Sequence, residues 1–189
     1  MQYMHYNACQ QGLPALFSEP PIRPYAVKEI STVSQAITIL VGTMTGTAEM
    51  VAEEVSDVLK AAGHTVTVKP MDNLDGSVFQ GGGLFLICTS TYGQGDVPDN
   101  AMKLYEDLKA KKPDLSSVDY GVFSLGDRTY AETFNFGGKK FDALLSELKA
   151  KRVGEIFTHD ASAGTIPEDE GVKWVKEWAK LLDARAQAA

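Results

Sequence analysis

The sequence predicts an α/β domain in which a doubly wound parallel sheet carries helices on both faces. Two observations predict it. From residue 36 onward, short apolar runs alternate with longer segments whose apolar residues recur at helical spacing. The short runs are rich in Val, Ile, Leu and Phe without strict polar alternation, which is typical of strands covered on both faces. Repeated strand–helix units of this kind favour a parallel sheet.

The first half of the domain should contain three strands and two helices. The strands are expected at 36–42, 64–71 and 83–91. A helix is expected at 47–63, because Met50, Val51, Val55, Val58 and Leu59 form an apolar stripe and a glycine stands at its end. The next helix is expected at 99–112, whose last turn is rich in lysines that offset the helix dipole.

The second half should contain two strands and two helices. Strands are expected at 118–126 and 154–161, separated by a helix at 136–150. A last helix is expected at 167–186, and its two tryptophans, four residues apart, should pack into the core.

Composition and charge narrow the class of protein. The 189 residues are 44% hydrophobic, enough for one core, and the net charge of −7 disfavours nucleic acid and favours basic partners. Residues 1–35 lack periodicity and hold four prolines, so we expect an extension there, the α/β domain at 36–185 and a tail at 186–189. Two cysteines, Cys9 and Cys88, are too few for a disulfide framework. No apolar run approaches the ~20 residues that a helix needs to span a bilayer. We therefore expect a cytoplasmic monomer without membrane insertion.

Three loops at the carboxyl ends of predicted strands form the candidate site, because ligands of doubly wound sheets bind at this edge. In the first loop, "GTMTGTAE", three threonines stand beside a helix N-terminus, and Gly46 lets the backbone approach a ligand. The loop has no Lys for a triphosphate and no G-x-G-x-x-G, so it favours a single phosphate held by neutral donors. The alternative is that the threonines only cap the helix.

The second and third loops each bring an aromatic residue to the same edge. "TSTYGQGDVPDNA" carries Tyr92 in a glycine-rich turn, and "LGDRTYAETFNFGG" carries Tyr130 with Phe134 and Asn135 behind it. Aromatics at loop tips have little core to fill, so a planar ligand explains them better. Two aromatics and a phosphate cradle describe the shape of flavin mononucleotide (FMN).

At these loops, over residues 37–182, the sequence resembles the flavodoxin-like flavoproteins, above all the FMN domains of cytochrome and sulfite reductases and the small MioC-type flavodoxins. The resemblance implies a five-stranded sheet in the order 2-1-3-4-5 and FMN as cofactor. It implies that Tyr92 and Tyr130 flank the ring and that the Gly93 carbonyl accepts from the reduced ring. The implied FMN ligands are Thr43, Met44, Thr45, Gly46, Thr47, Ala48, Thr91, Tyr92, Gly93, Gly95, Leu125, Gly126, Asp127, Tyr130, Phe134, Asn135 and Asp160.

The sequence departs from the family's pattern at two places. Three residues separate Tyr130 from the Phe134–Asn135 pair, where the family commonly has two. The family also has an acidic ligand near the last strand, for which Asp160 is the candidate. The fifth strand has no long insertion, which points to the short-chain form.

The resemblance implies a one-electron carrier between a reductase and a basic haem or iron–sulfur protein. Four carboxylates are expected near the ring: Asp96, Asp99, Asp127 and Glu132. Their negative charge would oppose the uptake of a second electron by the flavin and would attract basic partners. The same acids would also suit an ordinary solvated face of an acidic protein. Two alternatives stay open. One is an NAD(P)H:quinone-type reductase, for which we find no nicotinamide site, and the other is the FMN domain of a larger diflavin reductase.

Two further classes are disfavoured. A signalling receiver domain needs paired acids after the first strand and an Asp after the third, where this chain has Gly42-Thr43 and Thr89 to Thr91. The three histidines, His5, His64 and His159, lie on unrelated elements without metal-ligand spacing, so we expect ordinary surface or packing roles and no metal.

Overall fold

The computed structural model describes residues 34–188. The expectations for residues 1–33, including Cys9 and His5, and for residue 189 lie outside the described residues. The boundaries expected at 35 and 185 stay predictions, although the last helix continues past the second of them to Ala188.

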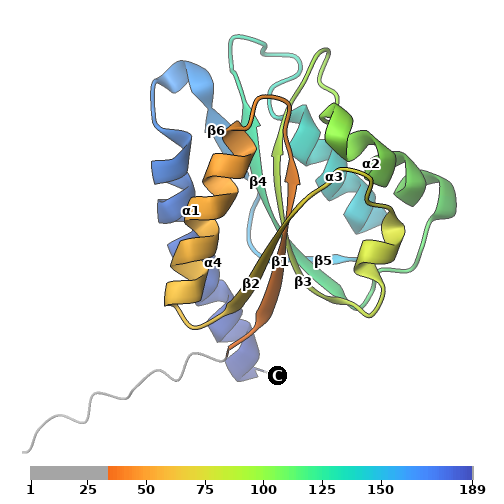
Figure 1. The fold of residues 1–189 in the computed structure, drawn as a ribbon, viewed down its shortest axis with the longest axis vertical. Helices are drawn as coiled ribbons and strands as arrows, with labels where there is room; N and C mark the ends of the chain where they lie inside the picture. Colours follow the sequence, from red (N-terminus) through yellow and green to blue (C-terminus); the bar gives the residue numbers. More distant parts are fainter. Residues whose placement is uncertain (1–33, 189) are drawn as a thin grey trace, which may run out of the picture. The chain divides into compact units, whose positions relative to one another are not determined.

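The sheet has parallel strands in the order β2-β1-β3-β4-β5, and this confirms the predicted order (Figure 1). A sixth strand, β6, also pairs with β4. The strands are β1 Ala36–Gly42, β2 Thr65–Pro70, β3 Gly83–Ser90, β4 Val118–Gly126, β5 Lys151–Arg152 and β6 Phe157–Asp160. Because every strand runs the same way, the loops after β1, β3, β4 and β6 meet at one edge of the sheet.

The predicted strand at 154–161 is wrong in its first half, because the chain pairs with β4 in two short pieces, β5 and β6. The break lies at Gly154, whose positive φ of 74° takes the chain out of the ladder. Just before it, the Val153 amide still donates to the Tyr120 carbonyl at 2.7 Å, and the Val153 carbonyl accepts from the indole of Trp178 at 3.0 Å. The strand resumes at Phe157, and only β6 reaches the edge that carries the loops.

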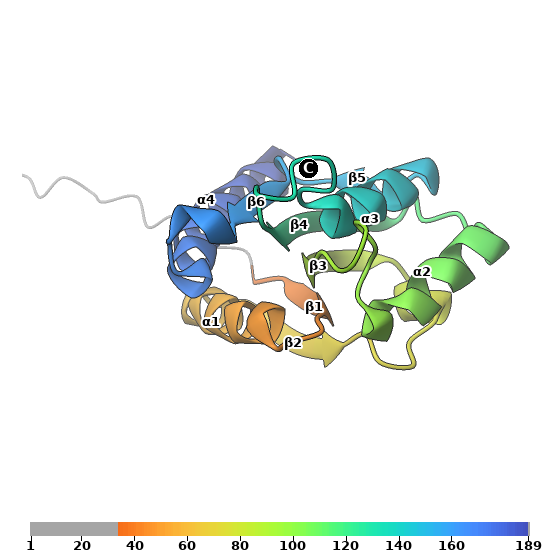
Figure 2. The same ribbon diagram turned by 90° about the horizontal axis from the view of Figure 1, so that it is seen from above.

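Four helices cover the sheet, with α1 and α4 on one face and α2 and α3 on the other (Figure 2). They are α1 Thr47–Ala61, α2 Asp99–Lys111, α3 Phe136–Glu147 and α4 Pro167–Ala188, and two 3-10 turns are η1 Gly76–Phe79 and η2 Ala161–Ala163. Helix α3 ends before its predicted limit of residue 150, since Lys149 takes a left-handed conformation with φ 72°. No helix among residues 34–188 is long and apolar enough to cross a bilayer.

Two apolar cores lie on the two faces of the sheet. On the α1 and α4 face, Trp178 is fully buried and stacks on Trp174 with ring centroids 5.7 Å apart, as the sequence predicts for these residues. Cys88 lies in the same core, and its thiol donates to the Ala48 carbonyl at 3.2 Å. Burial raises the pKa of this thiol well above its usual range, so the cysteine is unreactive at neutral pH.

Candidate functional site

A cavity of about 590 Å³ opens at the carboxyl edge of the sheet, where the loops after β1, β3, β4 and β6 meet. It is large enough for a ligand of nucleotide size. Its lining comes from all three predicted loops and from the segment that joins β6 to α4. The lining residues are Thr45, Thr47, Ser90, Thr91, Tyr92, Gly93, Leu125, Gly126, Asp127, Tyr130, Thr133, His159, Ala161, Thr165 and Pro167.

The first loop presents hydroxyl groups and a helix N-terminus to the cavity. Thr45 and Thr47 line it, whereas the Thr43 hydroxyl accepts the Gly46 amide at 2.9 Å and so closes the turn. Gly46 has φ 87°, and a Cβ placed on it would meet nothing within 4 Å. One threonine therefore closes the turn before the helix, which has no side-chain cap among residues 34–188, while two hydroxyls and the amides at the start of α1 remain available to an anion.

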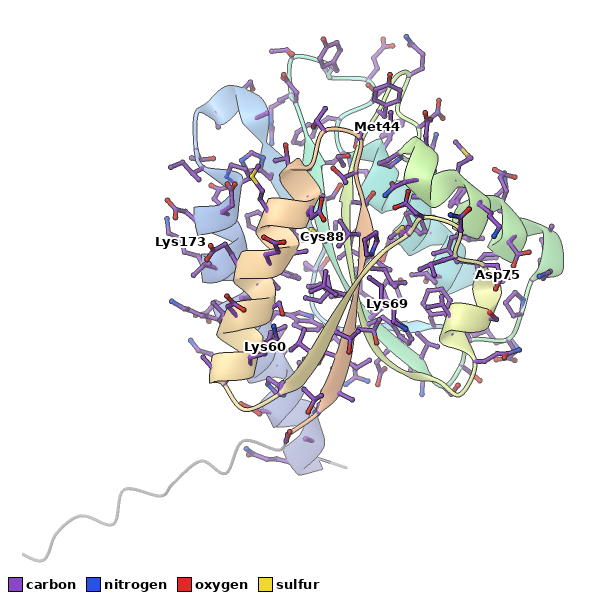
Figure 3. The ribbon with its side chains drawn as sticks, viewed as in Figure 1. Met44, Lys60, Lys69, Asp75, Cys88 and Lys173 are labelled. Atoms are coloured by element: carbon purple, nitrogen blue, oxygen red, sulfur yellow. The ribbon has the colours of Figure 1, made fainter. Side chains whose placement is uncertain are left out.

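The first loop is fastened to α2 by Asn100, a residue that the sequence analysis missed. Its side-chain oxygen accepts the Thr43 amide at 2.9 Å, and its nitrogen donates to the Val41 carbonyl at 3.3 Å and to Asp72 at 3.2 Å. Met44 leans outward toward α2, where its sulfur accepts the Asp99 amide at 3.3 Å (Figure 3). Because Asn100 is 57 positions from Thr43, only the fold makes this contact visible.

The second loop is a tight turn with one open side. The backbones of Tyr92 and Asp96 bond to each other at 2.9 and 2.7 Å. Gly95 is packed, since a Cβ there would lie 2.9 Å from Thr133 and from Phe136. Gly93 has φ 53°, a Cβ on it would meet nothing within 4 Å, and Tyr92 is 50% exposed. The turn therefore offers an unpacked peptide and an aromatic face to the cavity.

The third loop brings Tyr130 to the cavity despite the additional residue before Phe134. Successive turns, closed by Tyr130 amide to Asp127 carbonyl at 3.1 Å and Thr133 amide to Tyr130 carbonyl at 3.0 Å, absorb the extra length. Tyr130 is 68% exposed, so most of its ring is not packed against the protein. Phe134 instead packs beneath Arg128, with the guanidinium 4.7 Å from the ring centroid.

Asn135 joins three elements beneath the third loop. It is buried, has φ 58° and precedes α3, and its side-chain nitrogen donates to the His159 carbonyl at 3.0 Å. Gly126 is required here, because a Cβ on it would lie 2.7 Å from the Asn135 amide nitrogen. Asn135 therefore sets where the end of β4 meets the end of β6.

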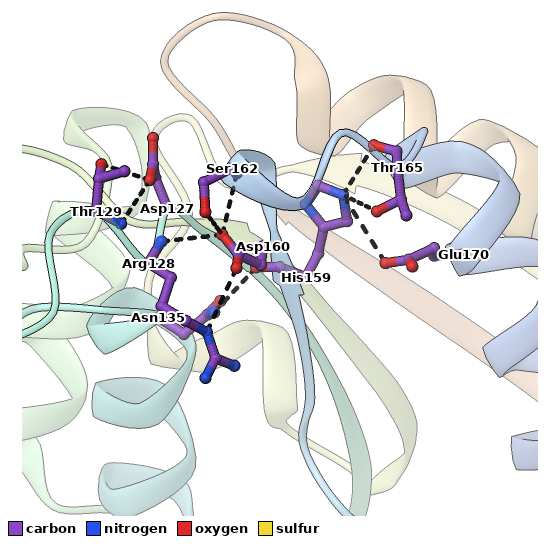
Figure 4. Close-up of polar contacts among 9 residues, drawn as sticks. All are labelled: Asp127, Arg128, Thr129, Asn135, His159, Asp160, Ser162, Thr165 and Glu170. Atoms are coloured by element: carbon purple, nitrogen blue, oxygen red, sulfur yellow. Dashed lines mark hydrogen bonds and ion pairs between the residues drawn. The ribbon is translucent and has the colours of Figure 1, made fainter.

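Asp160 ties the third loop to the end of β6 (Figure 4). Its carboxylate accepts the Arg128 amide at 3.0 Å and the Ser162 hydroxyl at 2.7 Å, and it pairs with the Arg128 guanidinium at 3.3 Å. It is not among the residues that line the cavity. The hydrogen bond from Ser162, followed by that from the Arg128 amide, holds the pKa of Asp160 below its usual range.

Replacing Asp160 by alanine should make the domain less stable at neutral pH and erase that difference in acid. A carboxylate with a lowered pKa stabilises the fold above its unfolded pKa of about 3.9, and this contribution disappears as the pH falls through the folded value. Melting temperatures of both proteins between pH 7 and pH 2 check this. A difference that stays constant below about pH 4 would show that the carboxylate charge has no part in it.

His159 and Thr165 also line the cavity, whereas the sequence analysis expected only an ordinary surface or packing role for His159. The histidine is buried, and its Nε2 lies 3.4 Å from the Thr165 carbonyl and 3.8 Å from the Glu170 carboxylate. It is thus both packed and part of the cavity wall. The signal that could have found it is its place one residue before Asp160, at the end of a strand that reaches the same edge.

The fold thus brings part of the predicted set to the cavity itself: Thr45, Thr47, Thr91, Tyr92, Gly93, Leu125, Gly126, Asp127 and Tyr130. The other predicted residues are not among those that line the cavity: Thr43, Met44, Gly46, Ala48, Gly95, Phe134, Asn135 and Asp160. Sequence analysis missed Asn100 and the lining residues Ser90, Thr133, His159, Ala161, Thr165 and Pro167.

Comparisons with known proteins agree with this architecture. The family profile described as "Flavodoxin" matches residues 39–174. The chain is 43% identical to Flavodoxin YqcA of Escherichia coli over 146 residues, which are 77% of this chain and 97% of that one. It is 37% identical to Protein MioC of the same organism over 149 residues, again 77% and 97% of the two chains. Part of a Shewanella sulfite reductase flavoprotein component is similar as well.

A solved structure shows the same fold. The C101A mutant of a flavodoxin from Pseudomonas aeruginosa superposes with a TM-score of 0.70 at 35% identity, covering 78% of this chain and 98% of that one. The resemblance inferred from the three loops is therefore confirmed, and the chain belongs to the flavodoxin family.

Proposed function

We propose that this protein binds FMN in the cavity and carries electrons one at a time between a reductase and an acceptor redox protein in the cytoplasm. One observation carries the proposal: a single cavity joins a hydroxyl-lined helix N-terminus to two exposed tyrosines. A phosphate suits the first of these features and a flat ring suits the second.

The residues present fit FMN. Open space beside the backbone at Gly46 and at Gly93 leaves room for a ligand to approach both ends of the cavity. The donors around Thr45 and Thr47 are neutral, which suits one phosphate better than a triphosphate. Bound flavin would supply the redox chemistry, because it accepts electrons singly.

The chain's own residues would bind, orient and shield the cofactor. Thr45 and Thr47 would hold the phosphate together with the amides that begin α1. Tyr92 and Tyr130 would cover the ring faces and exclude water from them. The peptide at Gly93 would bond to the ring edge, since Gly93 lines the cavity and no neighbour is packed against its Cα.

The carboxylates near the loops support a basic partner. Among the described residues, Asp99, Asp127 and Glu132 form no ion pair, whereas Asp96 pairs with Lys140 at 2.7 Å. Their charge would speed the encounter with a positively charged redox protein, so the association rate should fall with salt. Within residues 34–188, three of the four carboxylates expected near the ring are therefore without an ion pair.

A visible spectrum of the purified protein mixed with FMN tests the proposal. We expect two flavin bands, FMN bound in a one-to-one ratio, and a long-wavelength absorbance that rises and then falls during stepwise anaerobic reduction. Failure to bind FMN would overturn the proposal. Direct passage from yellow to colourless, or consumption of NADPH by the isolated protein, would instead favour a two-electron quinone-type reductase.

A further inference from the structure

We propose that Lys140 is a positioning residue of this electron carrier, which anchors the 92–96 turn through Asp96 and thereby sets the reduction potential of the bound flavin. The inference rests on the proposed function for its effect on the flavin. The anchoring of the turn can be tested without any cofactor.

The turn is attached to the start of α3 at three points. The Lys140 ammonium lies 2.7 Å from the Asp96 carboxylate, with 35% and 56% of the two side chains exposed. The Gly137 amide donates to the Thr91 hydroxyl at 3.1 Å, just before the turn. Gly95 leaves no room for a Cβ against Phe136. Because the third loop leads directly into α3, both tyrosine loops rest on one helix.

These attachments hold the second limb of the turn, and backbone hydrogen bonds from Gly95 and Asp96 hold Tyr92 on the first limb, so only the tip is unpacked. Gly95 and Asp96 are fixed by packing and by the ion pair. A Cβ on Gly93 would meet nothing within 4 Å, so the tip of the turn is not packed against a neighbour. Because the turn is anchored at Gly95 and Asp96, it would present the Gly93 peptide to the ring in one position. An unanchored glycine-rich turn would sample many positions.

Lys140 also changes the electrostatics beside the ring. Its ammonium offsets Asp96, the one carboxylate of the turn itself. Removing the lysine exposes that negative charge, which opposes a second electron on the flavin. For a charge roughly 8 Å from the ring, the equilibrium constant for taking up the second electron should fall by about 2- to 30-fold.

The test compares Lys140→Met with Lys139→Met. Lys139 is the adjacent residue, carries the same charge and donates to the Phe134 carbonyl at 2.7 Å, without pairing with Asp96. Both variants remove one positive charge from α3, but only the first removes the anchor. Lys140→Arg and the double variant Asp96→Asn/Lys140→Met complete the set.

The first measurement is hydrogen exchange at the amides of Tyr92, Gly95 and Asp96 in the protein without FMN, because these amides close the turn. We expect exchange to accelerate up to about fivefold in Lys140→Met, to stay unchanged in Lys139→Met and to recover in Lys140→Arg. Equal exchange in the two methionine variants would overturn the anchoring role.

The second measurement is the pair of one-electron potentials with FMN bound. We expect Lys140→Met to lower the second-electron potential more than Lys139→Met does, and the double variant to restore it in part. If the potential shifted but exchange did not accelerate, Lys140 would act only through its charge, and this would overturn the positioning role. If the unmodified protein failed to bind FMN, the proposed function would fail. The exchange experiment would still show whether Lys140 anchors the 92–96 turn.

Discussion

Replacing Thr45 and Thr47 together by valine should weaken FMN binding by about 100-fold or more. Valine keeps the shape of threonine but removes the two hydroxyls that line the cavity beside the start of α1. A hydrogen bond to a charged group contributes about 1.5–3 kcal/mol, so the loss of two corresponds to about 3–6 kcal/mol. Since 1.4 kcal/mol is about tenfold, the dissociation constant should rise by ~10² to ~10⁴. Quenching of flavin fluorescence during titration measures this constant.

One matched control keeps both hydroxyls at positions 45 and 47, and the other removes a threonine hydroxyl away from the cavity. Thr45→Ser/Thr47→Ser should bind FMN nearly as well as the unmodified protein. Thr65→Val lies on β2, is exposed, and does not line the cavity, so it should leave binding unchanged. An affinity of the double valine variant within about threefold of the original would mean that the hydroxyls only shape the turn.

Trp178→Ala should lower the free energy of unfolding by about 3–5 kcal/mol, the usual cost of truncating a buried large aromatic residue. The indole is 1% exposed, and it lies so close to β4 that a Cβ on Gly121 would be 2.6 Å from its nitrogen. It also donates to the Val153 carbonyl, which would be left without that bond. Urea unfolding followed by circular dichroism gives the free energy.

The control for this variant lies on the same helix. Leu181 is 45% exposed, so Leu181→Ala should cost less than about 1 kcal/mol. Trp178→Phe should fall between the two, because it keeps most of the volume but loses the hydrogen bond. If Trp178→Ala were no more destabilising than Leu181→Ala, the neighbouring side chains would have to collapse into the space of the indole.

The sequence predicted the cavity loops well because each contains a residue type that its position does not otherwise require. Threonines beside a helix start and tyrosines at loop tips have weak structural reasons to be there, so they indicate a ligand. It predicted the surroundings of those loops less well. Asp96 is an ordinary acid in the sequence, and only the approach of Lys140 from α3 reveals that its charge is offset.

By itself, the sequence determined the periodic elements and therefore the parallel sheet, since hydrophobic spacing depends on local geometry alone. It also determined which loops lie at the binding edge, because chain direction in a parallel sheet places every strand end together. The tertiary structure alone decided the contacts between distant residues, such as Asn100 with Thr43 and Arg128 with Asp160. It also divided the last strand at Gly154, where the carbonyl of the preceding residue meets Trp178. These contacts depend on how side chains from separate elements pack, and no local pattern carries that information.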